Sequence, residues 1–258
     1  MKENIEKSIR ILDFVISQSD KTNSYFHKQK PDFITQFCLC MIERLNFSSV
    51  SLKALLKIAL ENSKVEYSCG IILRSVFLDS IILLNALEIT GKTDQGMLSE
   101  LNKFCFDMLG DSVKHTLVNF KDEYSQESQD TIKNMYSNLV AENLDFFELY
   151  ANDGTPPVPK DIRKYTNKEL VGNIKKSKDF NQRVDLYRAY LYYSKYDHFG
   201  HMFYSLSRKD FLIRLDNLNK AIREIPKAFL FAQSMLLFRP DTFLESQYRE
   251  VEAFINAM

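Results

Sequence analysis

Glycine is scarce in this chain, with 7 glycines and 6 prolines among 258 residues. β-Hairpins and tight α/β loops depend on glycine for backbone conformations that other residues avoid. So few glycines argue against an all-β fold and against a glycine-looped α/β fold. Between the glycines and prolines, apolar side chains recur every three to four positions, which is the period of a helix. The sequence therefore predicts an all-α fold, a multi-helix bundle of about eight to ten helices.

Capping residues and prolines suggest where these helices begin and end. An amphipathic segment covers residues 3–19, and a second helix should begin at Pro31 and end near Phe47. Three serines are candidate N-caps of a third helix: Ser48, Ser49 and Ser51. Further helices are expected over residues 64–91, 95–122, 128–150, 166–178 and 181–207, followed by others near Pro226 and Pro240.

The segment NDGTPPVPK, residues 152–160, is the clear interruption of the helical pattern. Its three prolines could present a polyproline ligand, but an ordered surface connection is the preferred interpretation. Neither side of the segment has a composition of its own. We therefore expect residues 1–258 to form a single helical domain, with this connection between two halves of the bundle.

Charge and cysteine content narrow the classes of partner and compartment. The chain has 34 basic and 34 acidic residues, so no global field would attract nucleic acid, although a local basic patch remains possible. The four cysteines form no CxxC pair, which favours reduced thiols and a cytoplasmic location. The apolar run 69–89 approaches membrane-spanning length but contains Arg74 and Asp79, each costing about 2.5–3.5 kcal/mol near a bilayer centre. We expect a core helix there and no membrane partner.

Arg74 and Asp79 lie in a helix that is apolar nearly all round, so both charges should lose much of their water. Five residues separate them, which places them roughly 140° apart on the helix and prevents easy pairing with each other. A buried charge requires a partner. The helix expected at 181–207 has the most polar residues to offer, so we predict that these two long helices pack together at the centre of the bundle.

A polar stripe on the 181–207 helix supplies the remaining candidate site residues. Tyr190, Ser194 and His198 follow at i, i+4 and i+8, and His201 lies one turn further, all within about 80° of one another. Asp197 is close enough in angle to orient a histidine. With Arg74 and Asp79, the candidate catalytic residues are Tyr190, Ser194 and His198. A purely structural network of ion pairs and hydrogen bonds is the alternative.

Other chemistries leave weaker signals in the sequence. His198 and His201, at i and i+3, could bind a metal, but no HExxH or ExxH signature is present. A metal-dependent hydrolase is therefore the third hypothesis, behind a site without metal. No glycine-rich phosphate loop, GxSxG elbow or dinucleotide fingerprint occurs, so no cofactor is predicted.

The combined pattern resembles a known family. An Arg74–Ser75 pair in an apolar helix, an acid about one turn later, and then Tyr190-x3-Ser194-x3-His198 after a proline-containing loop are similar to an uncharacterised all-α bacterial family grouped with the HEPN-like proteins. The resemblance covers roughly residues 64–206. It departs at one place: the acid expected four residues after the arginine is Leu78, and Asp79 follows it.

The resemblance implies a role in handling RNA or nucleotides, in bacterial stress responses or phage defence. HEPN-like ribonucleases cut RNA without metal, using an arginine separated from a histidine by four to six residues. None of the four histidines has an arginine at that spacing. A composite site is the remaining catalytic hypothesis, in which Arg74 stabilises phosphate charge and His198 acts as acid or base.

A non-catalytic binding or oligomerisation module is the alternative function. In that case the polar residues would form a buried structural network, and the C-terminal helix could serve as the surface of a homo-oligomer. The residues on its apolar face are Phe243, Leu244, Tyr248, Val251 and Ile255.

Overall fold

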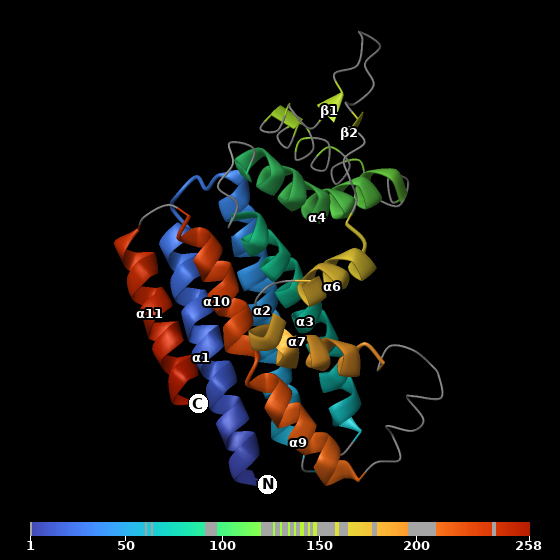
Figure 1. Cartoon of the computed structure of the whole chain (residues 1–258), viewed down its shortest axis with the longest axis vertical. Coiled ribbons are helices and arrows are strands. Elements are labelled where there is room, and N and C mark those ends of the chain that lie inside the picture. The colour runs from blue at the N-terminus through green and yellow to red at the C-terminus, as the bar shows by residue number, and fades with distance from the viewer. Residues whose placement is uncertain are drawn as a thin grey trace. The chain divides into compact units, whose positions relative to one another are not determined.

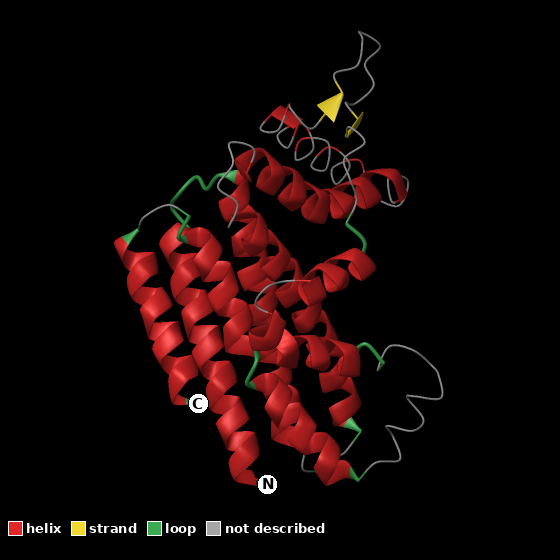
Figure 2. Ribbon diagram, in the orientation of Figure 1, coloured by secondary structure: helices red, strands yellow, loops and turns green. Residues whose placement is uncertain are grey.

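The computed structural model describes most of the chain, and the structural statements below refer to this part. Described are residues 2–59, 61, 62, 64–90, 97–119, 165–176, 180–195, 210–238 and 241–258, with single positions or pairs between 126 and 159. The helices are α1 (Lys2–Phe26), α2 (Phe33–Ile58), α3 (Val65–Thr90), α4 (Met97–Asn119), α6 (Asn167–Lys176), α7 (Phe180–Tyr193), α9 (Phe211–Ile222), α10 (Ile225–Leu236) and α11 (Thr242–Ala257) (Figures 1 and 2). The predicted all-α helical bundle is confirmed.

The chain divides into two compact units. One unit joins Met1–Thr93 to Asn167–Met258, and the other is Asp94–Thr166. The second unit contains α4 and a two-residue antiparallel pairing of β1 (Phe147–Glu148) with β2 (Val158–Pro159). Two residues of the proline-containing segment, Val158 and Pro159, thus form β2 of the second unit, and the prediction of a single domain stays a prediction.

Helix α3 occupies the core of the first unit, where it packs against α2, α6, α7, α9 and α10 (Figure 1). Its bounds, Val65–Thr90, agree with the predicted 64–91 to within one residue at each end. By length and composition it could cross a membrane, but 61% of its most apolar window is buried within the protein. That burial is typical of a core helix, and it explains why the helix is apolar nearly all round.

Helix α2 corrects the prediction of two shorter helices. It runs unbroken through the three serines proposed as N-caps, and its true N-cap is Asp32, whose carboxylate accepts a 2.8 Å hydrogen bond from the Thr35 amide. Ser49 is fully buried between apolar residues of the same helix. Burial of one continuous face outweighs the local preference of serine for a helix start.

Helix α7 is shorter than the predicted 181–207 helix. It ends at Tyr193, and a turn follows at Ser194 and Lys195, whose amides bond to the carbonyls of Tyr190 and Tyr192. Residues 196–209 are outside the described part of the chain. The predicted packing of this helix against α3 is present, although α2 and α10 also border α3, which the sequence had not indicated.

The apolar face of α11 packs against α1 rather than lying open. Phe243 stacks on Tyr25 with ring centroids 4.4 Å apart, and Phe254 stacks on Phe14 at 3.8 Å. Leu244 is buried in the same helix. Much of the surface that we proposed for oligomerisation is therefore covered within the chain.

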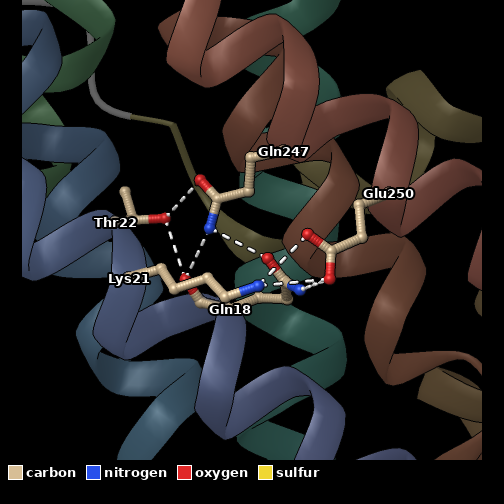
Figure 3. A network of polar contacts seen from close by, with 5 residues as sticks. All are labelled: Gln18, Lys21, Thr22, Gln247 and Glu250. Atoms are coloured by element: carbon tan, nitrogen blue, oxygen red, sulfur yellow. Dashed lines mark hydrogen bonds and ion pairs between the residues drawn. The ribbon is translucent and has the colours of Figure 1, made fainter.

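Polar side chains cross the same α1–α11 interface (Figure 3). The Gln247 amide donates to the carbonyl and side-chain oxygens of Gln18, at 2.7 and 3.0 Å, and its own oxygen accepts from Thr22 at 2.9 Å. At the edge of this network Gln18 and Lys21 both donate to Glu250. The buried part of the network is thus uncharged, and the charges lie at its exposed margin.

Candidate functional site

Two contacts fix how α7 lies along α3. At one end the Arg183 guanidinium bonds to the Glu88 carboxylate, with Nη1 and Oε1 2.7 Å apart. Towards the other end the Tyr193 ring packs on Phe77, with centroids 5.9 Å apart. The two helices are therefore antiparallel, and the last turn of α7 rests on the middle of α3. Arg74 lies one helical turn before Phe77 and so falls at this junction.

We use the name α3–α7 junction for Arg74, Phe77, Tyr190, Tyr193 and Ser194. Three of these residues were predicted from the sequence as site residues, and all three are half-buried: Arg74, Tyr190 and Ser194. The Ser194 hydroxyl donates to the Leu191 carbonyl at 2.9 Å, which leaves its oxygen lone pairs to accept a further bond. Arg74 thus lies one helical turn from Phe77, the residue whose ring meets the end of α7 that carries the Tyr190 and Ser194 hydroxyls.

The phenol of Tyr193 and the thiol of Cys69 belong to the buried side of the junction. Burial raises the pKa of Tyr193 well above its ordinary value, and the neighbouring Tyr192, Glu66 and Cys69 raise it further. Burial likewise raises the pKa of the Cys69 thiol to about 12, with a smaller contribution from Glu66. Both groups therefore stay protonated near neutral pH and are poor nucleophiles or bases.

Asp79 pairs with a residue that the sequence analysis did not consider. Its carboxylate accepts a bidentate interaction from Arg44 of α2, with Nε–Oδ2 and Nη2–Oδ1 distances of 3.0 and 3.1 Å. The side chain of Asp79 is 4% exposed and that of Arg44 is 58% exposed. Burial raises the pKa of the Asp79 carboxyl, and the bond to Arg44 counteracts part of that rise.

This pairing changes the role of Asp79. We had expected it to find its partner on the helix that carries Tyr190 and Ser194, and the observed hydrogen bonds instead join it to α2. The cause is the angular position of Asp79, which faces α2 while Arg74 lies roughly 140° away around α3. We therefore treat Asp79 as a structural residue of the α2–α3 interface.

A second ion pair joins α3 to α9 and was missed by the sequence analysis. The Arg214 guanidinium bonds to the Glu66 carboxylate, with Nε and Oε2 3.0 Å apart. Both side chains are largely buried, at 14% and 5% exposure respectively. Nearby, the Asn217 amide donates to the Tyr192 hydroxyl at 3.5 Å. The available signal was that Glu66 stands three and seven residues before Cys69 and Leu73, on the core face of α3.

The histidine part of the predicted site cannot be placed. Asp197, His198 and His201 lie outside the described residues, so the metal hypothesis on the two histidines stays a prediction. Within the described part of the chain, no group of three or more His, Cys, Asp or Glu side chains could hold a metal ion. The polar groups of the junction are the Arg74 guanidinium and the hydroxyls of Tyr190, Tyr193 and Ser194, of which Ser194 donates to the Leu191 carbonyl.

Comparison of the chain with family models, with curated proteins and with solved structures found no match.

Proposed function

We propose that the α3–α7 junction binds a phosphate-bearing ligand, either RNA or a nucleotide, through Arg74. The observation that carries this proposal is the Phe77–Tyr193 contact, because it brings the end of α7 to the turn of α3 that bears Arg74. A guanidinium can hold a phosphate by two parallel hydrogen bonds. The Tyr190 hydroxyl can donate to a remaining phosphate oxygen, whereas Ser194 can do so only by giving up its bond to the Leu191 carbonyl. The resemblance to HEPN-like proteins suggests the same class of ligand.

The position of Asp79 supports recognition of an anion. A carboxylate pointing into the junction would repel phosphate, whereas the Asp79 carboxylate is bonded to Arg44 on the side of α3 that faces α2. Its negative charge is thereby neutralised at a distance from the ligand. A binding site at Arg74, Tyr190 and Ser194 would then not include the Asp79 carboxylate.

Binding can be tested directly with a labelled single-stranded RNA and with ATP, using fluorescence anisotropy and calorimetry. We expect Arg74→Gln to weaken binding at least about 10-fold, since hydrogen bonds to charged groups contribute about 1.5–3 kcal/mol. For RNA the slope of log K against log salt should fall by about 1. The matched control is Arg188→Gln, which removes an arginine that is 72% exposed on α7. Equal losses in the two variants, or no binding by the natural sequence, would contradict the proposal.

Catalysis at the junction is a separate question that His198 can answer. If it acts as acid or base on the bound phosphate, His198→Ala should lower turnover of RNA or nucleotide by about 10²–10⁴-fold. The melting temperature should be nearly unchanged. Retained turnover in that variant would assign the chemistry to other residues. Binding without turnover in both the natural sequence and the variant would show that the junction binds its ligand and does not catalyse a reaction.

A non-catalytic helical module is the second candidate function. Two observations favour it: Asp79, one of the proposed catalytic groups, is held by Arg44, and Glu66 is held by Arg214. On this alternative the natural sequence turns over no RNA or nucleotide. His198→Ala would then lower the free energy of unfolding by roughly 1–3 kcal/mol, because it removes a partner from a buried polar group.

A further inference from the structure

Helix α11 is held in place by less buried surface than its neighbour α10. Three of its 16 residues are buried, whereas eight of the 12 residues of α10 are buried. The three are Leu244, Gln247 and Val251, of which Gln247 is polar. Burial of apolar side chains supplies most of the free energy that holds a helix against a domain. The packing of α11 should therefore be weaker than that of α10.

The two aromatic pairs between α1 and α11 lie in the partly exposed part of their interface. Phe14 and Phe254 are half-buried although their rings stack, and so are Tyr25 and Phe243. A surface groove of about 720 Å³ along α1 has Tyr25 and Phe243 among its lining residues. Because these rings already contact water, separating the pairs exposes less new apolar surface than separating two core residues would.

The polar contacts between α1 and α11 can be replaced by water. Gln247 bonds to Gln18 and Thr22, and all three side chains are uncharged (Figure 3). The ion pair at the margin, Lys21 with Glu250, has side chains that are 46% and 50% exposed. Uncharged groups regain hydrogen bonds in water, and exposed ion pairs contribute little to stability. Separation of the two helices therefore leaves none of these groups buried without a partner.

Contacts on other sides of α1 hold it to the rest of the first unit. The Ser8 hydroxyl donates to the Asn219 side chain of α9 at 2.6 Å, and Asp13 pairs with Lys53 of α2. Helix α1 also packs along α2 and against α10. None of these contacts involves α11, so α1 can stay in place when α11 leaves it.

Helix α11 also has an N-terminal cap of its own. The Asp241 carboxylate, directly before the helix, accepts a 2.9 Å hydrogen bond from the Leu244 amide. An α-helix forms its backbone hydrogen bonds within itself. The helix can therefore separate from α1 as one unit, without first losing its cap or its backbone bonds.

We propose that α11 is a movable cover of α1, which opens as one unit while the rest of the first unit stays folded. Opening exposes four side chains of α1 to water: Phe14, Gln18, Thr22 and Tyr25. The chain thus has a closed and an open state, and this face of α1 is accessible only in the open state. The inference goes beyond the proposed phosphate site, with which it shares no residue, so either can fail without the other.

Hydrogen exchange of the natural sequence, followed by mass spectrometry, measures opening helix by helix. A detached helix of 16 residues is only marginally stable in water, so the α11 amides exchange when the cover opens. We expect them to exchange at least about 10-fold faster than the amides of α3 and α10. Low concentrations of urea should accelerate exchange steeply in α3 and only slightly in α11, because opening of the cover exposes little surface. Equal rates, or an equal dependence on urea, would overturn the proposal.

A conservative substitution in the core separates opening of α11 from unfolding of the whole unit. Ile81→Val, at a fully buried position of α3, weakens the closed and the open state equally relative to the unfolded state. It should raise exchange in α3 and α10 about 2- to 10-fold and leave exchange in α11 unchanged. The matched control is Ile213→Val, at an isoleucine that is 54% exposed on α9, and it should change neither. Acceleration of α11 by the same factor as α3 would mean that α11 opens only when the unit unfolds.

Thiol labelling tests the same opening at a single side chain. Val251→Cys places a thiol at a fully buried position of α11, and Cys38 of α2 is a fully buried thiol in the same molecule. With each rate divided by its value in the urea-unfolded chain, the thiol of Val251→Cys should react at least about 10-fold faster than Cys38. The substitution itself weakens the closed state and raises both rates together, so their ratio still reports the opening. A ratio near one would overturn the proposal.

Discussion

The α1–α11 interface and the surroundings of α3 bury polar groups by different means. Between α1 and α11 the buried groups are neutral amides and hydroxyls, those of Gln18, Thr22 and Gln247 (Figure 3). Around α3 two of them are carboxylates, Glu66 and Asp79, and each pairs with an arginine from another helix, beside the neutral Ser80 and Asn85. The first interface is held by hydrogen bonds whose strength does not depend on protonation. The second is held by pairs in which loss of one partner leaves a buried charge.

This difference predicts how each interface responds to damage. Removing one member of an uncharged network leaves a buried donor or acceptor unsatisfied, whereas removing all members together can leave the free energy of unfolding nearly unchanged. Removing the arginine of a buried pair leaves a carboxylate in a medium of low polarity, which lowers the free energy of unfolding much more. The following variants test that contrast.

The largest effect is expected at Arg214. Arg214→Met should lower the free energy of unfolding by about 3–5 kcal/mol, because it removes the guanidinium that is bonded to the Glu66 carboxylate, a side chain only 5% exposed. Urea denaturation followed by circular dichroism measures the change. Arg223→Met, at an exposed arginine that caps the end of α9, is the control and should cost less than about 0.5 kcal/mol. A loss below about 1 kcal/mol at Arg214 would show that the pair adds little to stability.

A smaller and pH-dependent loss is expected at Arg44. Because the Arg44 side chain is half exposed, water can replace part of its bond to Asp79, and Arg44→Met should cost about 1–3 kcal/mol at neutral pH. In the variant, burial alone acts on Asp79, so its folded pKa lies above the unfolded value. As the pH falls, Asp79 of the variant is therefore protonated in the folded state at a higher pH than in the unfolded state.

The free energy of unfolding that Arg44→Met loses relative to the natural sequence should therefore shrink as the pH falls from 7 to about 4, which is near the ordinary pKa of an aspartate. Thermal unfolding measured across that interval follows the change. A deficit that is constant or grows on acidification would mean that Asp79 is not the stranded charge.

The neutral network should respond in the opposite way to combined substitution. Gln247→Leu alone should lower the free energy of unfolding by about 1–2 kcal/mol, with little dependence on pH from 5 to 8. The triple variant Gln18→Leu, Thr22→Val and Gln247→Leu should recover most of that loss, because no buried partner is left unsatisfied. A triple variant that loses about three times as much would show that the three side chains contribute additively, each without depending on the others.

The smallest effect, and one of opposite sign, is expected at Gln233 on α10. This side chain is fully buried, and within the described residues neither its amide nitrogen nor its oxygen has a hydrogen-bond partner. Gln233→Met keeps the volume and removes the unsatisfied groups, so it should raise the free energy of unfolding by up to about 1 kcal/mol. Gln29→Met, at an exposed position, should be neutral. Destabilisation at Gln233 would indicate a buried water or another partner for the amide.

The fold was largely predictable from local patterns, as α3 illustrates. Its continuous apolar run between Lys64 and Gly91 fixed both ends, because helix length and capping are properties of neighbouring residues. The same reasoning failed at Ser49, where the serine is buried inside α2. That outcome depends on the helices packed against α2, and a local capping preference of about 1 kcal/mol cannot anticipate it.

The candidate site was predictable in part. The sequence correctly placed α7 against α3 and rejected a pair between Arg74 and Asp79, since angles around one helix follow from spacing alone. It did not identify Arg44 as the partner of Asp79 or Arg214 as that of Glu66. Those pairings depend on the register and rotation of two helices relative to each other, which are tertiary properties that no single segment encodes.

The packing of α1 against α11 also sets an order of events during synthesis. Thr22 and its partner Gln247 are 225 residues apart, so at about 5–20 residues per second the earlier helix leaves the ribosome roughly 10–45 s before the later one. Throughout that interval Phe14 and Tyr25 lack the aromatic rings that cover them in the finished protein. During translation α1 therefore exposes apolar side chains until α11 emerges, and we expect chaperones to bind the nascent chain mainly at α1.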